Sequence, residues 1–237
     1  MSGLRYNAVT HVGRVRKINE DSILALPDQG IWVVADGMGG HAAGDFASQT
    51  VVETVAALPH NLEPADRMRG LRGAIQKAHD AIQIEAERKG GVTIGAAVVA
   101  LMIADGHFVA FWSGDSRLYL YRDGVIDLLT SDHSVVAELV KSGQMTWDEA
   151  EMHPHSNAIT HAVGVGDAPG LEKIRGVVRP GDRFLLCSDG LNKYAGFETL
   201  RGVLESAPIE TATETLLQIA LDGGGKDNIS VIVVDVS

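Results

Sequence analysis

The sequence predicts an α+β protein in which helices cover antiparallel β-sheets, and two patterns carry this prediction. Pairs of short apolar runs meet at Asp105-Gly106 and at Asp123-Gly124, and an Asp-Gly dipeptide between two such runs is typical of a β-hairpin. Two longer stretches, 41–58 and 63–89, space their apolar residues three or four positions apart, as amphipathic helices do. Hairpins give antiparallel sheets and amphipathic helices need an apolar surface to cover, so a layered domain is expected.

The first half of the chain is expected to contain a strand, the two helices and two hairpins, in that order. A short apolar run predicts the strand at 31–35, just before the helix at 41–58. The two predicted hairpins pair 94–103 with 107–112, and 117–121 with 125–129.

The second half begins with residues 134–170, which are expected to form short helical stretches and loops. Strand signals return at 173–178 and 183–187, where β-branched and aliphatic residues dominate. Two helices and a final strand at 229–236 complete the prediction.

Length and composition indicate one domain spanning residues 1–237, because 45% hydrophobic residues supply ample material for a single core. No apolar run reaches the ~18 residues of a membrane span and no basic, apolar leader begins the chain, so we expect a cytoplasmic protein without membrane contact. The formal net charge of -11 makes nucleic acid an unfavourable partner. A monomer is the default expectation.

Cys187 is the only cysteine, so the chain cannot form an internal disulfide, and its place at the end of an apolar run predicts a buried strand residue. A phosphatase with a cysteine nucleophile would need an arginine six positions later. This chain has Lys193 there, and Asp189 within the loop would repel phosphate. Covalent thiol catalysis is therefore disfavoured.

Five short acidic motifs lie at the edges of apolar runs, from one end of the chain to the other. They are NED at 19–21, DGMGG at 36–40, GDSR at 114–117, SDG at 188–190 and KDN at 226–228. Their aspartates could meet in a folded protein only if cations lay between them, since carboxylates repel one another and lose hydration on burial. Oxygen ligands favour Mg²⁺ or Mn²⁺ over Zn²⁺. Each motif taken alone is more typical of a turn than of a metal ligand.

The order and flanks of these motifs resemble the metal-dependent protein phosphatases of the PP2C-like (PPM) family, in their bacterial stand-alone form. The resemblance rests on VRKINED, VVADGMGGHAAGD, FWSGDSRLYL, LLCSDGL and GGKDNISVIVV, and it runs from about residue 13 to 234. It implies a four-layer α-β-β-α sandwich of two antiparallel sheets with flanking helices. It also implies a metal centre in a cleft between the sheets, and hydrolysis of phosphoserine and phosphothreonine in phosphoproteins.

Asp36 is the best candidate for a ligand that bridges two ions, because it leaves a predicted strand into a glycine-rich turn. Gly37 lacks a Cβ, so its carbonyl could closely approach an ion. Two close divalent ions can create a nucleophile by acidifying a water that bridges them. The resemblance implies the same arrangement, with the Asp36 carboxylate shared by two core ions and the Gly37 carbonyl on the first.

The resemblance also assigns the remaining acidic residues to positions around the ions. Asp189 and Asp227 would bind the second ion, and Asp115 would hold a third, weaker one. The residues expected to act through coordinated waters are Glu20, Asp21 and Asn228.

Arg16 and His41 are the expected catalytic partners of the metals, together with Asp21. Arg16 matches the phosphate-binding arginine of the family, and its planar guanidinium suits a phosphate oxyanion. His41 follows the glycine turn, where an imidazole could protonate the leaving alkoxide. Without the motifs, Arg16 would be read as a surface arginine and His41 as an exposed residue at a helix start.

Residues 136–166 resemble the family's flap, a segment beside the active cleft that contacts substrate. His161 stands within it where many bacterial relatives have arginine, and it is a candidate for substrate contact or for ordinary packing. Gly91-Val92-Thr93 and Asn192-Lys193 also depart from the usual family pattern. Partners implied by the resemblance are phosphorylated proteins, in particular substrates of a Ser/Thr kinase.

Two other functions are compatible with parts of the sequence. Gly37, Gly39 and Ala42 have the G-x-G-x-x-A spacing of a dinucleotide-binding oxidoreductase, although Asp36 would then face the pyrophosphate unfavourably. A phosphoprotein-binding regulatory module that keeps the fold without the chemistry is the other alternative. The presence of all five acidic motifs with Arg16 and His41 favours the enzyme.

Overall fold

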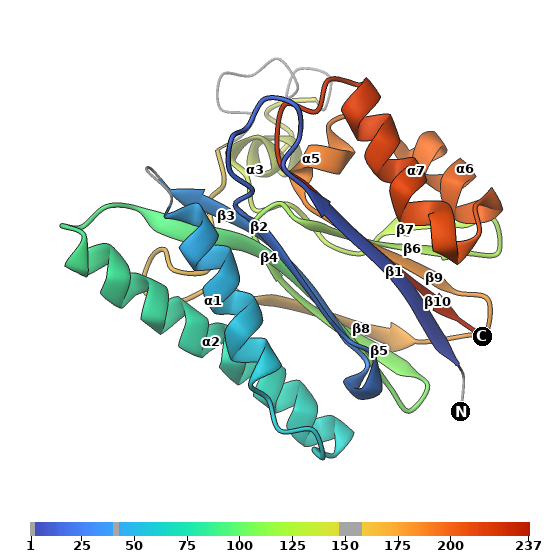
Figure 1. The fold of residues 1–237 in the computed structure, drawn as a ribbon, viewed down its shortest axis with the longest axis horizontal. Coiled ribbons are helices and arrows are strands. Elements are labelled where there is room, and N and C mark those ends of the chain that lie inside the picture. Colours follow the sequence, from blue (N-terminus) through green and yellow to red (C-terminus); the bar gives the residue numbers. More distant parts are fainter. Residues whose placement is uncertain (1–2, 40–42, 147–157) are drawn as a thin grey trace.

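The computed structural model describes residues 3–39, 43–146 and 158–237, and in this part of the chain two β-sheets are stacked between two layers of helices (Figure 1). All strand pairs within the two sheets are antiparallel. The first sheet has the order β1 (Leu4–His11), β10 (Ile229–Val236), β9 (Arg183–Cys187), β6 (Arg117–Arg122) and β7 (Val125–Leu128). The second sheet has the order β2 (Asp21–Leu26), β3 (Ile31–Gly39), β4 (Ile94–Ala104), β5 (His107–Ser113) and β8 (Glu172–Val177).

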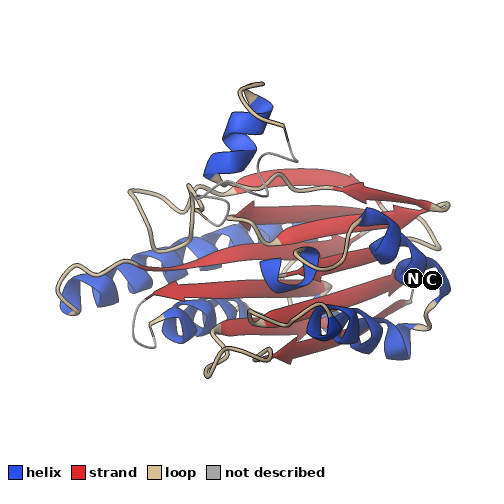
Figure 2. Ribbon diagram, turned by 90° about the horizontal axis from the view of Figure 1, so that it is seen from above, coloured by secondary structure: helices blue, strands red, loops and turns tan. Residues whose placement is uncertain are grey.

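The helices cover the outer faces of the sheets, so that strands fill the middle of the molecule (Figure 2). The long helices α1 (Gly44–Ala56) and α2 (Pro64–Arg88) pack on the second sheet, whereas α6 (Phe197–Ser206) and α7 (Ile209–Asp222) pack on the first. Shorter helical elements are η1 (Pro27–Gln29), α3 (Val135–Lys141) and α5 (Asp189–Asn192). The predicted α-β-β-α sandwich is therefore confirmed.

Three apolar layers hold these elements together, and β3 shows how one strand serves two of them. Ile31, Val33 and Ala35 face the layer between the second sheet and its helices, while Trp32 and Val34 face the layer between the two sheets. Successive side chains of a strand point to opposite faces, so a strand buried on both faces is apolar throughout. The third layer lies between the first sheet and α6 and α7.

Both predicted hairpins are present, with the predicted turns. Asp105 and Gly106 have φ of 49° and 70°, and Asp123 and Gly124 have φ of 52° and 83°. Two central residues with positive φ match the right-handed twist of the strands that they connect, which explains the Asp-Gly choice.

The strand boundaries near the acidic motifs differ from the prediction. β3 does not end at Ala35 but continues to Gly39, because β4 pairs with it as far as the Gly39–Ile94 register. Asp36 therefore lies within a strand and not at its end. The strands β1 and β2 were not predicted, and α1 begins at Gly44, with residues 40–42 outside the described part of the chain.

The strand arrangement contradicts the dinucleotide-binding alternative. That fold needs parallel strands joined by crossover helices, whereas β3, which precedes the glycine turn, pairs antiparallel with both of its neighbours. In the described residues, every helix is too short or too polar to cross a membrane.

Candidate metal centre

The second sheet contributes a pair of aspartates on adjacent strands. Asp21 begins β2 and lies opposite Asp36 of β3 in the antiparallel register. Gly37 follows, and its N–H donates to the Glu20 carbonyl oxygen over 3.1 Å. A Cβ at Gly37 would lie 2.0 Å from the Gly44 carbonyl oxygen, so only glycine allows the start of α1 to approach this strand.

The first sheet contributes Asp189 and Asp227 from the corresponding end. Asp189 opens α5 directly after β9, and Asp227 lies two residues before β10. α5 packs closely on the start of β10, since a Cβ at Gly190 would lie 1.9 Å from the Asn228 carbonyl oxygen. The contact brings the SDG and KDN motifs together.

Asp21 connects the two sheets. Its Oδ2 accepts hydrogen bonds from the hydroxyls of Ser188 and Ser230, over 2.8 and 2.7 Å, and both serines belong to the first sheet or its edge. The Ser230 N–H in turn donates to the Ser188 Oγ over 3.0 Å. The carboxylates of both sheets are thus held at one end of the sandwich by bonds that the sequence patterns did not predict.

Asn228 fixes the loop that carries Arg16. Its side-chain amide donates to the carbonyl oxygens of Val12 and Ile18, both over 3.0 Å, and its Oδ1 accepts from the Glu20 N–H over 2.8 Å. These bonds give Asn228 a structural role. Its contact with ions through water stays a prediction.

Two cations of the chain lie against the carboxylates. Arg16 makes two contacts with Asp227, Nε to Oδ1 over 3.0 Å and a terminal nitrogen to Oδ2 over 3.1 Å. Lys193 Nζ lies 2.6 Å from Asp189 Oδ2 and 3.6 Å from Asp227 Oδ2. Arg16 thereby reaches the predicted centre, with half of its side chain exposed to solvent.

The pKa values of the aspartates indicate that they act on one another. Burial raises the pKa of Asp21 to about 6, the serine hydroxyls oppose the rise, and the charges of Asp189 and Asp227 add to it. Burial also raises the pKa of Asp36 well above its usual value, and the other four aspartates raise it further. The structure therefore brings the aspartates of the five motifs to one place.

Asp115 joins this group from the loop between β5 and β6. Burial, followed by the charges of Asp189 and Asp132, raises its pKa to about 7. Burial likewise raises the pKa of Asp189, although Lys193 opposes the rise. Buried carboxylates that raise one another's pKa favour a counter-charge between them.

The donor set fits hard divalent ions. Asp21 Oδ1 and Asp189 Oδ1 are buried and have no hydrogen-bond partner among the described residues. Buried oxygens without a donor cost free energy, which a coordinated cation or its waters would remove. In the described ranges no group of three or more His, Cys, Asp or Glu side chains is arranged to hold a metal ion, and Asp189 and Asp227 contact Lys193 and Arg16 instead. Ions would therefore have to displace these internal cations.

The contacts of His161 in the described structure are with residues other than the clustered aspartates. Its ring is 5.0 Å from that of His133 and tilted by 65°, and its Nδ1 lies 3.2 Å from the Thr160 hydroxyl. Gly170 packs against it, since a Cβ there would lie 2.6 Å from the imidazole. His161 is nevertheless exposed, so its predicted contact with substrate stays a prediction.

His133 is a buried residue that the motifs did not indicate. Its Nδ1 accepts from the Gly114 N–H over 3.2 Å, and its Nε2 lies 3.2 Å from Glu172 Oε1. It thus supports the turn before Asp115 from the side of the flap-like segment. The predicted general acid His41 and the central part of the flap, 147–157, lie outside the described residues.

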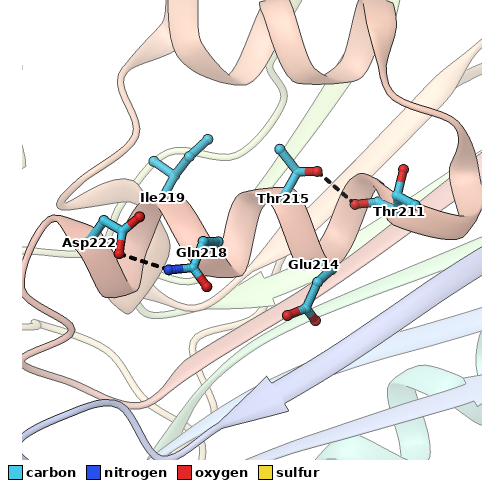
Figure 3. A pocket seen from close by; sticks show the side chains of 6 residues that line it. All are labelled: Thr211, Glu214, Thr215, Gln218, Ile219 and Asp222. Carbon is cyan, nitrogen blue, oxygen red and sulfur yellow. Dashed lines mark hydrogen bonds between the residues drawn. The ribbon is translucent and has the colours of Figure 1, made fainter.

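A shallow hollow is found elsewhere, on the outer face of α7 (Figure 3). Its lining residues are Thr211, Glu214, Thr215, Gln218, Ile219 and Asp222. Gln218 donates to Asp222 over 2.7 Å, so these polar groups are engaged with each other along the helix. None of the five acidic motifs contributes to it.

Comparison with curated proteins identifies relatives along the whole chain. The sequence model of the family described as Protein phosphatase 2C matches residues 12–222. Serine/threonine protein phosphatase PstP of Mycobacterium tuberculosis is 37% identical over 234 residues, which cover 98% of this chain and 45% of PstP, so the chain spans less than half of that relative. Protein phosphatase PhpP of Streptococcus pneumoniae is 36% identical over 245 residues, covering 99% of this chain and 98% of PhpP.

Solved structures agree with this fold. PppA, described as a key regulatory component of T6SS in Pseudomonas aeruginosa, is similar with a TM-score of 0.91 and 39% identity, over 99% of this chain and 98% of that one. The catalytic domain of a PstP, solved in complex with 2 manganese ions, is similar with a TM-score of 0.89 and 36% identity, over 100% and 99% of the two chains. The chain therefore belongs to the protein phosphatase 2C family.

Proposed function

We propose that this chain is a metal-dependent phosphoprotein phosphatase that hydrolyses phosphoserine and phosphothreonine. The observation that carries the proposal is the meeting of five aspartates at one end of the sandwich, with buried oxygens that lack partners and an arginine beside them. The reaction takes up one water and yields a hydroxyl side chain and inorganic phosphate.

The centre would hold two core ions, Mn²⁺ or Mg²⁺, through oxygen ligands. Asp36 would be shared by both, with the Gly37 carbonyl on the first and Asp189 and Asp227 on the second. When bound, such ions acidify water and neutralise phosphate charge. The manganese in the similar PstP structure supports this composition.

Three residues would complete the coordination around these core ligands. Asp115 would hold a third, weaker ion. Glu20 and Asp21 would position coordinated waters, and the bonds of Asp21 to the two serines restrict how its carboxylate can turn.

Arg16 would bind the phosphate of the substrate through its guanidinium. Its present partner is Asp227, so ion binding at Asp227 would free the guanidinium for an oxyanion. His41 would donate the proton that the leaving serine or threonine oxygen needs, an assignment that rests on its motif.

The partners would be phosphorylated proteins, and the relatives named as serine/threonine protein phosphatases support opposition to a Ser/Thr kinase. The cytoplasmic location and the monomeric state stay predictions. A non-catalytic regulatory module would need the fold without a working centre, and the complete set of acidic motifs supports the enzyme.

The test is phosphate release from phosphoserine, phosphothreonine and phosphotyrosine peptides, with Mn²⁺ and then with excess EDTA. We expect turnover of the first two peptides that EDTA abolishes. Asp36→Asn should remove it, while Asp105→Asn, which changes an aspartate in a hairpin turn, should retain it. Turnover that persists in EDTA or in Asp36→Asn would refute the mechanism, and specific phosphopeptide binding without turnover would favour the regulatory module.

A further inference from the structure

Lys193 lies at the proposed metal centre because it directly follows the short helix α5, which carries the predicted ligand Asp189. α5 holds Asp189 in its first position, and Lys193 follows its last residue, Asn192. The Lys193 Nζ lies 2.6 Å from Asp189 Oδ2 and 3.6 Å from Asp227 Oδ2, and 35% of its side chain is exposed. The ammonium group therefore contacts both aspartates proposed for the second ion.

The contact differs from an ordinary pair along a helix. Exposed pairs four residues apart contribute little to stability, because water screens them. Burial lowers the pKa of Lys193, but the charges of Asp189, Asp227 and Asp115 outweigh that effect and raise it, so the amine stays charged. One ammonium group thus acts on three of the five clustered aspartates.

Arg16 duplicates this role only in part, since its charge acts on Asp189 without a direct contact. Its side chain is 51% exposed, and its contact is with Asp227. Asp189, whose Oδ1 lacks a partner, has Lys193 as its neighbouring cation in the described structure. An ion that binds Asp189 must therefore move the lysine, and the flexible four-carbon stem permits this.

We propose that Lys193 is a tethered counter-ion of the metal centre, which stabilises the metal-free fold and competes with divalent ions for Asp189 and Asp227. The inference rests on the proposed metal centre. Before ions bind, the ammonium offsets part of the repulsion between the carboxylates. When they bind, the same charge must leave the two aspartates, so the affinity for the second ion is lower than the carboxylates alone would give. The residue thereby sets the ion concentration at which the centre fills.

The experiment compares Lys193→Met, which keeps an unbranched side chain one atom shorter and removes its charge, with Lys193→Arg, which keeps the charge. Lys77→Met, on the exposed face of α2, controls for the change in net charge. Lys193→Gln serves as a second neutral variant in case methionine impairs folding. Each protein is stripped with EDTA and dialysed. Calorimetric titration with Mn²⁺ and thermal unfolding without metal are then measured.

We expect both neutral variants to bind Mn²⁺ roughly tenfold more tightly than the wild type, and to unfold at a lower temperature when metal-free. Lys193→Arg and Lys77→Met should resemble the wild type in both measurements. Neutral variants that bind Mn²⁺ no more tightly than Lys77→Met would overturn the inference, as would metal-free neutral variants that keep the wild-type unfolding temperature. A wild type that binds no Mn²⁺ at all would instead refute the proposed metal centre itself.

Discussion

Replacing Asp21 by asparagine should stabilise the metal-free protein at neutral pH, although it removes a residue of the proposed centre. Asp21 is 6% exposed, and burial raises the pKa of its carboxyl from 3.8 to about 6. One pKa unit corresponds to about 1.4 kcal/mol, so the ionised form costs the fold on the order of 3 kcal/mol. Asparagine cannot ionise, and its Oδ1 can still accept from Ser188 and Ser230.

The sign of the pH dependence follows from the direction of the shift. A carboxyl whose pKa is raised by folding binds its proton more tightly in the folded state, so stability falls as pH rises between the two pKa values. The penalty from Asp21 is nearly absent at pH 4 and complete by about pH 7. The advantage of Asp21→Asn should therefore grow across this range and then stay constant.

The measurement is urea unfolding in EDTA, followed by tryptophan fluorescence at pH values from 4 to 8. Asp182→Asn is the matched control, since Asp182 is also buried but makes two 2.7 Å contacts with Arg122. Loss of these charge-assisted bonds should destabilise the protein at pH 8 by about 1.5–3 kcal/mol. An Asp21→Asn protein that is less stable than the wild type at pH 8, or a difference that does not change with pH, would refute the reasoning.

Four further predictions concern catalysis and metal content. Asp36→Ala should abolish turnover, whereas Asp115→Ala should lower turnover and leave two tightly bound ions. Calorimetry counts the bound metal beside the kinetics. Full activity in Asp36→Ala would exclude the two-ion centre. Arg16→Ala should lower kcat/KM by roughly one to two decades, because a charge-assisted phosphate contact contributes about 1.5–3 kcal/mol; an unchanged kcat/KM would remove it from phosphate binding. His41→Ala should slow kcat more on phosphopeptides than on p-nitrophenyl phosphate, whose phenolate needs less protonation, and equal losses would exclude the acid role. His161→Arg should raise kcat/KM for acidic phosphopeptides near pH 8 without affecting the aryl ester, whereas identical profiles on both substrates would indicate that His161 only packs.

The hairpins and the amphipathic helices could be predicted because their signals are local. An Asp-Gly turn between apolar runs, or apolar residues three and four apart, needs no knowledge of the rest of the chain. β1 offered no such signal, since its exposed and partly buried residues do not alternate regularly. Its partner β10 lies more than 200 residues away in the sequence, so its strand conformation depends on tertiary pairing.

The candidate site shows the same division between local and distant information. The aspartates could be proposed from their motifs, because each motif is a short continuous segment. The bonds from Ser188 and Ser230 to Asp21 join residues 167 and 209 positions apart, and no pattern within one segment contains them. The contact between Lys193 and Asp227 was equally hidden, although the departure at Lys193 from the family pattern was visible in the sequence.

The pairing of β1 with β10 has a consequence for when the proposed metal centre can be completed during synthesis. Both strands run side by side along their whole length, from the Leu4–Val236 pair to the His11–Ile229 pair (Figure 1). β1 is translated long before the strand beside it and before the Asn228 amide that fixes the Arg16 loop. A growing chain therefore holds Asp21 and Asp36 long before Asp227 exists, so the proposed metal centre cannot be complete until Asp227 and Asn228 have been translated.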